Sequence, residues 1–406
     1  MTVTIPDFTQ GRAFDDPWEA YRWLREHDPV HWSEDAGCWL LSRHAEVSHV
    51  SRHPELYCSK HGVRPRNATP LSILTMDDPE HQQQRSIINR GFTPRQVRRL
   101  APHIREITDE ILDEIQGRGE IEFVTDFAIH VPLIVIAELM GLDPSMRKQL
   151  HRWSDDMMAG EGRGPDDPSA QHSTQAAMEF VEYLLPLIEE RRANPREDLI
   201  SILTGAFDEG TLDTGSATTL EQSGELGSDD LLLFLIALLV AGNETTRNAI
   251  SGGLAAFSRF PEERERLIAN PELIDTAVEE IVRYVSPVLS FSRTVTADHE
   301  LCGKRLKEGD TVLMLYQSAN RDALVFDDPD TFRIDRNPNP HLAFGFGPHY
   351  CLGANLARLE IKIVFEELFA RLRDIRVADP ATLRRADNAL VIAIEQLPAV
   401  FTPVRV

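Results

Sequence analysis

The stretch FGFGPHYCLG occupies residues 344–353 and places Cys351 in a loop crowded with glycine and aromatic residues. The residues that follow, LGANLARLEIKIVFEELF, have the apolar spacing of an amphipathic helix. The thiol is therefore expected at a helix N-terminus, where free N–H groups and the helix dipole stabilise a thiolate. A shielded thiolate is a good ligand for a soft metal ion. A structural cysteine beside a glycine-rich turn fits the spacing equally well.

Glycines and aromatic residues surround this cysteine. Gly345, Gly347 and Gly353 each permit a tight or left-handed backbone, so that their amides can approach the sulfur. Phe344 and Tyr350 are placed to shield it from water. The loop thus supplies what a buried thiolate ligand needs from its surroundings.

The pattern F-x-x-G-x-[HR]-x-C-x-G in this loop resembles the haem-binding signature of the cytochrome P-450 family. It is matched at Phe344, Gly347, His349, Cys351 and Gly353. The resemblance implies haem b as the cofactor and Cys351 as the axial ligand of its iron. It also implies that His349 reaches a haem propionate. Three loop residues are expected to bind the cofactor: Phe344, Gly345 and Gly353.

The composition is that of an ordinary globular protein and excludes several classes. The 406 residues are 42% hydrophobic and 26% charged, with a net charge of −23. This acidity argues against binding to nucleic acid or to an anionic membrane surface. The most apolar run, 231–242, is too short to cross a bilayer, and the first residues do not resemble a signal peptide. We therefore expect a cytoplasmic protein without a membrane anchor.

Four cysteines stand at positions 38, 58, 302 and 351, and none forms a CxxC pair. The spacing predicts neither a zinc site nor a disulfide framework.

Helical periodicity dominates the chain. It predicts helices over 16–27, 43–52, 79–90, 94–116, 124–141, 144–158, 173–192, 228–260, 261–268, 272–285 and 354–373. Strand patterns are limited to a hairpin at 30–42, an alternating stretch at 292–317 and a short piece at 389–402. The acidic, Gly/Ser-rich stretches 159–172 and 207–227 are predicted loops.

No other segment has the composition of a linker, so we predict one large, mainly α domain over 1–406 with small β-sheets. The resemblance specifies this as the cytochrome P-450 fold with a long central oxygen-binding helix.

The middle of the predicted helix 228–260 reads AGNETT, residues 241–246. Ala241 and Gly242 leave room for something flat or small, and Glu244 and Thr245 form an acid–alcohol pair that can relay protons. A packing glycine beside two surface polar residues is the alternative. The stretch resembles the family pattern [AG]-G-x-[DE]-T-[TS]. This implies that Ala241 and Gly242 face the cofactor, that Thr245 steadies the oxygen molecule and that Glu244 delivers protons.

Glu280 and Arg283 are spaced i, i+3 in EEIVR, although Glu263 and Arg266 have the same spacing. The first pair lies upstream of Cys351 where the family has a structural ion pair. The resemblance implies a third, basic member upstream of the loop; Arg336 is the candidate, and Arg333 is close by.

Several basic residues resemble the family's propionate ligands. They are His81 and Arg85 in MDDPEHQQQR and Arg293 after SPVLSFS. Two carboxylates facing several cations is sensible chemistry, and His349 would be the fourth basic partner. Each residue taken singly is equally compatible with a solvated surface position.

Residues 81–100 contain five arginines and no acid, which makes a local basic island in an acidic chain. We predict that an acidic ferredoxin docks there through Arg95, Arg98 and Arg99. A solvated helix face is the alternative. No nucleotide-binding glycine loop is present, so electrons are expected from a ferredoxin and its reductase.

The stretches AGNETTRNAISGG, SANRDALVF, NPNPHLAFGFG and CLGANLARLE resemble a bacterial subgroup that oxidises sterol side chains, methyl-branched lipids and terpenoids. One departure is Ala393, where the subgroup usually has glycine. The predicted substrate pocket is apolar, although each member also fits a plain core position. It comprises Val63, Leu71, Ile73, Leu74, Ala237, Val285, Val288, Leu289, Val391 and Ile392.

The sequence as a whole predicts a monomeric, oxygen- and ferredoxin-dependent haem monooxygenase. We expect it to hydroxylate an apolar substrate, a sterol-like or terpenoid lipid, at a terminal or allylic carbon. One alternative is the same chemistry on a macrolide, an aromatic compound or another secondary metabolite. A second is a non-catalytic haem sensor or binding protein, and a third is a metal-free helical scaffold.

Overall fold

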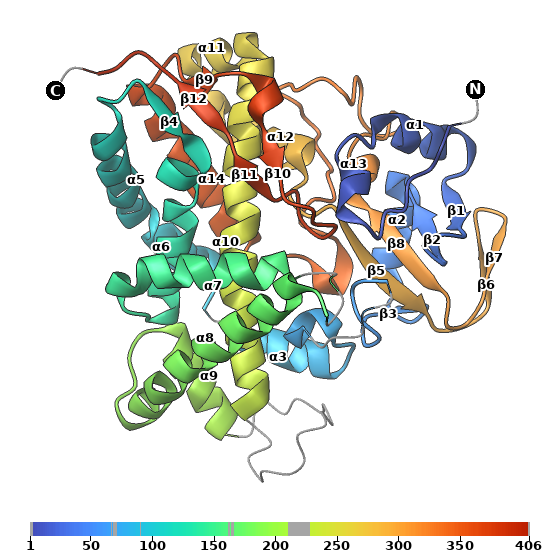
Figure 1. Ribbon diagram of the computed structural model, residues 1–406. Coiled ribbons are helices and arrows are strands. Elements are labelled where there is room, and N and C mark those ends of the chain that lie inside the picture. The colour runs from blue at the N-terminus through green and yellow to red at the C-terminus, as the bar shows by residue number, and fades with distance from the viewer. Residues whose placement is uncertain are drawn as a thin grey trace.

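The computed structural model describes residues 3–65, 67, 71–89, 91–160, 163, 166–209 and 228–404. The predicted loop 207–227 lies almost wholly outside these ranges, as does part of the loop 159–172. Helices dominate the described residues (Figure 1), which confirms the mainly α prediction. No helix among the described residues has the length and apolar character needed to span a bilayer.

The α-helices follow one another along the whole chain. They are α1 (Trp18–His27), α2 (His44–Arg52), α3 (Glu80–Ile88), α4 (Pro94–Arg99), α5 (Ala101–Ile115), α6 (His130–Met140), α7 (Arg147–Ala159), α8 (Pro168–Ala193), α9 (Leu199–Asp208), α10 (Ser228–Arg259), α11 (Pro261–Ala269), α12 (Ile274–Val285), α13 (Tyr316–Ala319) and α14 (Ala354–Arg371).

The largest sheet has five strands in the order β1-β2-β8-β5-β3. Its strands are β1 (Val30–Ser33), β2 (Cys38–Leu41), β3 (Tyr57–Cys58), β5 (Ser290–Val295) and β8 (Thr311–Leu315). Only the β2–β8 pairing is parallel, with Leu40 opposite Leu313. The hairpin predicted at 30–42 is the β1–β2 pair, in which Trp32 lies opposite Trp39.

Three smaller sheets complete the β structure of the described residues. One has the order β4-β12-β9, and the others are the pairs β6–β7 and β10–β11. The strands are β4 (Glu120–Glu122), β6 (His299–Leu301), β7 (Lys304–Leu306), β9 (Arg376–Val377), β10 (Arg384–Arg385), β11 (Ile394–Gln396) and β12 (Pro398–Val400).

Helix α10 runs through the centre of the molecule, with α5, α6 and α14 on one side and the five-stranded sheet beyond α12 on the other (Figure 1). Aromatic rings join α10 to α14. The ring centre of Phe257 lies 5.4 Å from that of Phe365 and 5.0 Å from that of Phe369. This packing fixes the helix that follows Cys351 against the middle of the fold.

The helices of the structure differ from the prediction in two places. The predicted helix 94–116 is divided at Leu100 into α4 and α5, because Pro102 lies at the start of the second helix and cannot donate a backbone hydrogen bond. Helix α9 was not predicted, although the apolar residues of LISILTGAFD have helical spacing at 199, 203 and 206; only Gly205 weighs against a helix. Its long apolar side chains nevertheless join the main core, and tertiary packing decides its conformation.

Candidate active site

The loop that carries Cys351 is shaped by two glycines with positive φ. Gly345 has φ 69° and Gly347 has φ 70°, values that residues with side chains rarely adopt. Gly347 also lies so close to α2 that a Cβ atom on it would be 2.1 Å from the carbonyl oxygen of Ser51. The Cys351 N–H donates to the Phe344 carbonyl at 2.8 Å and closes the loop. The sequence pattern therefore encodes one specific backbone path.

The sulfur of Cys351 is accessible although it lies deep in the loop, three residues before α14 begins. Burial raises the pKa of its thiol, whereas hydrogen bonds from the backbone of Gly353 and Ala354 and the charges of Arg85 and Arg358 lower it. Gly353 has φ −82°, so the left-handed backbone expected there is not needed. Aligned N–H groups and cations around an accessible sulfur suit a thiolate that ligates a metal ion.

A charged network fastens this loop to the neighbouring helices. The guanidinium of Arg358 lies 4.4 Å from the centre of the Phe344 ring and donates to Tyr350 Oη at 3.0 Å. Arg358 also donates to Glu279 Oε1 at 2.6 Å, and His341 Nε2 lies 3.0 Å from Glu279 Oε2. Burial alone would raise the pKa of Glu279, but these hydrogen bonds lower it to about 2. These contacts thus hold the cysteine loop in place against the neighbouring helices.

Two predicted propionate ligands, His81 and His349, lie against each other with ring centres 4.2 Å apart. His81 is 1% exposed, and its Nε2 has no hydrogen-bond partner. Ser59 Oγ lies 3.1 Å from His349 Nε2. Burial, helped by the charges of Arg293, His81 and Arg85, lowers the pKa of His349 to about 2.

Arg293 and Arg85 bring two further positive charges to the same region. Arg293 is 7% exposed, burial lowers its pKa, and it donates to the carbonyl of Ser292 at 2.7 Å. Arg85 donates to the carbonyl of Tyr350 in the cysteine loop. No acidic side chain of the described residues lies at ion-pair distance from either arginine.

In this basic cluster, drawn from α3, β5 and the cysteine loop, His81 Nδ1 lies 3.3 Å from Asp78 Oδ1, but neither arginine nor His349 has an acid at ion-pair distance among the described residues. Burying basic groups without an anion is unfavourable. The cluster therefore fits the two carboxylates of the haem that the cysteine loop implies, and the donor set as a whole fits that cofactor.

The middle of α10 presents an accessible strip in an otherwise buried helix. Ala241 is exposed, and Thr245, one turn later, is half-buried and donates to the Ala241 carbonyl at 2.8 Å. Gly242 faces α6, because a Cβ atom on it would be 2.8 Å from Ile136 Cγ1. Close packing of α10 on α6 thus explains Gly242, while Ala241 and Thr245 leave room for a flat group.

Glu244 is 1% exposed and belongs to a buried ion-pair network that the sequence did not reveal. Arg247 donates to Glu244 Oε2 at 2.5 Å and to Asp155 Oδ1 at 2.8 Å, and Glu244 Oε1 has no partner. Burial raises the pKa of Glu244 to about 7 although the Arg247 charge lowers it. The carboxyl is thus poised to hold and release a proton near neutral pH.

A second buried carboxyl, Glu360 on α14, lies beside this strip and was also missed. Its hydrogen bond with Thr246 joins α14 to α10, and burial raises the pKa of Glu360 to about 8. The sequence does carry a signal, since Glu360 stands four residues from both Leu356 and Val364 on the buried side of the helix. An acid on an apolar helix face is uncommon unless it is partnered.

The predicted structural ion pair is fully buried. Arg283 donates to Glu280 Oε2 at 2.8 Å through Nε and to Oε1 at 2.8 Å through Nη2. Arg336 Nε lies 3.1 Å from Glu280 Oε2, whereas Arg333 offers Glu280 its backbone N–H at 2.9 Å.

The ten predicted pocket residues do not form one group in the structure. Val63, Val285, Leu289 and Val391 are buried, and the others are half-buried or, like Ile73, at the edge of burial. Six of them are distributed over four hydrophobic clusters, namely Ile73, Val285, Val288, Leu289, Val391 and Ile392. Some are joined across the chain, since Val288 pairs with Val391 and the Ile392 N–H donates to the Pro287 carbonyl at 2.9 Å.

Arg95, Arg98 and Arg99 are all exposed on α4, which packs on α14. None of them pairs with an acid in the part of the chain that the structure describes.

Comparison with known proteins identifies the family. The model of the family described as cytochrome P-450 matches residues 166–374. A steroid C26-monooxygenase of Mycolicibacterium smegmatis is 37% identical over 406 residues, which cover 99% of this chain and 98% of the relative. The crystal structure of a Bacillus megaterium P-450 in complex with testosterone matches with a TM-score of 0.84 at 33% identity, covering 97% of this chain and 99% of that one. A Mycobacterium marinum P-450 in complex with pseudoionone matches with a TM-score of 0.87 at 32% identity, covering 99% of both chains.

Proposed function

The chain belongs to the cytochrome P-450 family and is a haem-thiolate monooxygenase, and from this premise we propose that it hydroxylates a sterol-like or terpenoid lipid at a terminal or allylic carbon. The observation that carries the chemistry is the exposed Cys351 beside a basic cluster in which Arg85 and Arg293 have no acid at ion-pair distance among the described residues. The lipid class is supported by the relative named as a steroid C26-monooxygenase and by the structural neighbours bound to testosterone and pseudoionone.

Different site residues are proposed to bind different parts of the cofactor. In this proposal Cys351 ligates the iron, while His81, Arg85, Arg293 and His349 bind the propionates. Haem, when bound, supplies the redox-active iron that activates oxygen. The accessible strip of α10 at Ala241 and Thr245 would leave room for a small molecule beside the bound cofactor.

The polar groups of α10 are proposed to handle the protons. Glu244 holds a proton on its carboxyl near neutral pH, because burial raises its pKa to about 7. Thr245 Oγ1, half-buried at the neighbouring position, donates to the Ala241 carbonyl and can accept a hydrogen bond at the same time. To relay a proton it would take one up on its oxygen and release its own. Arg247 and Asp155 fix the Glu244 side chain in place.

The substrate proposal is tested by titrating the ferric holoprotein with sterol ketones, sterols, fatty acids and terpenoids while following the Soret band. A low-spin to high-spin shift with a sterol ketone or a larger terpenoid, followed by product formation with reductant, is the expected result. A shift with small aromatic or macrolide compounds alone would leave the haem chemistry intact and overturn the lipid assignment.

One local feature bears on the subgroup. Ala393, where the subgroup usually has glycine, has φ 45° in the structure. A left-handed alanine costs about 1 kcal/mol relative to glycine. The segment that includes Val391 and Ile392 thus keeps the backbone that glycine would give, and the departure at Ala393 does not argue against the lipid proposal.

Replacing Thr245 by alanine is expected to uncouple reductant use from hydroxylation. Loss of one positioned hydroxyl, a hydrogen bond of about 1 kcal/mol, should lower product per reductant consumed roughly fivefold. Product and hydrogen peroxide are measured against reductant consumed. The matched control is Thr174→Ala on α8, which removes an exposed hydroxyl with the same bond to the carbonyl four residues earlier, at 3.0 Å. Unchanged coupling in Thr245→Ala would remove Thr245 from the proton path.

Glu244→Gln is expected to lower turnover about 100-fold, because glutamine keeps the shape but holds no acidic proton. Glu244 can donate only while protonated, so the wild-type rate should fall as pH rises through about 7. This limb of the pH profile should be absent in the variant. Glu182→Gln on the exposed side of α8 is the control. A variant that keeps both the rate and the limb would show that the proton comes from elsewhere.

We further propose that a ferredoxin, reduced by its reductase, docks on α4. Reversing Arg95, Arg98 and Arg99 to glutamate should slow haem reduction at low salt by about 10- to 100-fold, since steering depends on charge. Stopped-flow reduction measures the rate. The control reverses three exposed arginines near β9 and β10, namely Arg373, Arg376 and Arg384. Equal rates in both triple variants would place the dock on another face.

A further inference from the structure

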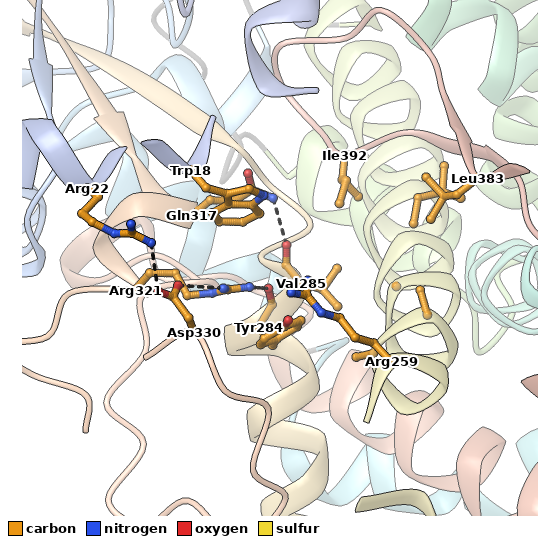
Figure 2. A pocket seen from close by; sticks show the side chains of 14 residues that line it. Trp18, Arg22, Arg259, Tyr284, Val285, Gln317, Arg321, Asp330, Leu383 and Ile392 are labelled. Atoms are coloured by element: carbon orange, nitrogen blue, oxygen red, sulfur yellow. Dashed lines mark hydrogen bonds and ion pairs between the residues drawn. The ribbon is translucent and has the colours of Figure 1, made fainter. Parts of the chain in front are cut away.

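A cavity of about 380 Å³ lies between α1, the C-terminal half of α10, the end of α12 and the C-terminal segment. Figure 2 shows Trp18 and Arg22 entering from one side, and Ile392 and Leu383 from the other. Its volume is in the range of small-molecule sites. Of the residues assigned above to the haem or to proton transfer, none lines it.

The floor of the cavity is apolar. It is made by Ala255 and Ala256 on α10 together with Leu383, Ile392 and Ile394 from the C-terminal segment. Small side chains on a helix face leave a level surface, which suits a ring system better than a branched chain. Burial of such a ring would supply the non-directional part of the binding energy.

The rim of the cavity carries an excess of positive charge. Arg321 is 5% exposed, lies 4.0 Å from the Tyr284 ring centre, and pairs with Asp330 at 3.2 Å. Arg22 reaches the same carboxylate only at 3.8 Å. Arg259 is exposed and has no acid at ion-pair distance among the described residues. Arg321 and Arg22 therefore share one carboxylate, and Arg259 has none among the described residues.

Gln317 gives the cavity a polar group that lacks a partner. Its side chain is 4% exposed, and its Nε2 donates to the Val285 carbonyl at 3.1 Å. Its Oε1 accepts no hydrogen bond. A buried acceptor without a donor is unfavourable, and a ligand hydroxyl or amine would satisfy it.

We propose that this cavity binds an amphipathic anion, a flat apolar ring compound with a carboxylate or sulfonate, as an effector separate from the substrate. The ring rests on the Ala255–Ala256 floor, the acid group faces Arg259, and a donor on the ring reaches Gln317 Oε1. The site does not depend on the proposed substrate class.

The cavity is connected to the segments expected to line the substrate pocket. Its wall contains Val285 and Ile392, and the Ile392 N–H donates to Pro287 O. Val288 and Val391, which lie close to these residues in the sequence, form an antiparallel β-bridge with each other. An occupant that presses on this wall shifts these pairs, so its binding and ligand binding at the haem should affect each other.

The test uses the holoprotein and anilinonaphthalene sulfonate, an aromatic sulfonate with a secondary amine whose fluorescence rises on binding. With the haem iron saturated by phenylimidazole, one equivalent should still bind. Arg259→Gln should weaken binding about tenfold through loss of a charge-assisted contact. Ala255→Leu should abolish binding by filling the floor, and Arg373→Gln, an exposed arginine elsewhere, should change nothing. The haem spectrum reports that each variant is folded.

Two outcomes overturn the proposal. Equal affinity of the sulfonate for wild type, Arg259→Gln and Ala255→Leu would rule out the cavity as the site. So would complete displacement of the sulfonate by phenylimidazole. Binding at the cavity with the same affinity at every phenylimidazole concentration rules out the effector role. The expected result is a change of about fivefold in the dissociation constant of the sulfonate, which levels off once phenylimidazole saturates the haem.

Discussion

Cys351→Ser is expected to abolish monooxygenase activity, with a fall of about 1000-fold or more, equivalent to about 4 kcal/mol of transition-state stabilisation. The serine hydroxyl has a far higher pKa than a thiol and is a poor ligand for a soft site, so it stays protonated beside the Gly353 and Ala354 amides. The measurements are product formation and the difference spectrum of the reduced carbon monoxide complex.

The chain offers a matched control for this substitution. Cys302 is also exposed, but its thiol donates to Glu46 Oε1 at 2.9 Å, and burial and that carboxylate raise its pKa to about 11. Cys302→Ser should leave both the spectrum and the activity unchanged. A Cys351→Ser protein with the wild-type carbon monoxide spectrum would show that another residue ligates the iron.

The sequence predicts this loop well because its information is local. Gly345 and Gly347 adopt the positive φ angles that their lack of a side chain permits, and the helix that follows begins three residues after Cys351. The β1–β2 hairpin is predictable for the same reason, since the turn and both strands lie within a few residues of each other. Short-range patterns of this kind survive in any tertiary context.

The proton-handling groups were predicted only in part because their environment is assembled from distant segments. Glu244 and Thr245 stand in a recognisable pattern, but Asp155 lies on α7, and only the fold brings it to Arg247. Glu360 likewise meets Thr246 only when α14 packs on α10. The substrate-pocket prediction is weaker still, since six of its ten members are divided among four clusters whose positions depend on packing.

The second large effect concerns Glu280, which gathers two buried cations. Both carboxylate oxygens accept hydrogen bonds from Arg283, which is 0% exposed, and Arg336 is 3% exposed. Asn339 adds a donor at 3.1 Å. Arg283 also donates to the carbonyl of Asn320 at 2.8 Å, so the group ties α12 to the segment that precedes the cysteine loop.

Glu280→Gln is expected to destabilise the fold by about 3–5 kcal/mol, because it leaves two buried guanidinium groups without a counter-charge. Glutamine fills the same volume, so the loss arises from charge and not from a cavity. This is a large share of the total stability of a domain, and little holoprotein should accumulate. Denaturant unfolding and the haem content of purified protein measure the effect.

Glu263→Gln is the control that separates buried charge from sequence spacing. Glu263 and Arg266 have the same i, i+3 spacing, but the pair is 3.4 Å apart and the Arg266 side chain is 39% exposed. Water solvates that arginine, and glutamine can still accept the Ile334 N–H that Glu263 accepts at 2.9 Å. The expected cost is below about 1 kcal/mol. Equal destabilisation by both substitutions would mean that burial of Arg283 and Arg336 does not set the energy of the Glu280 network.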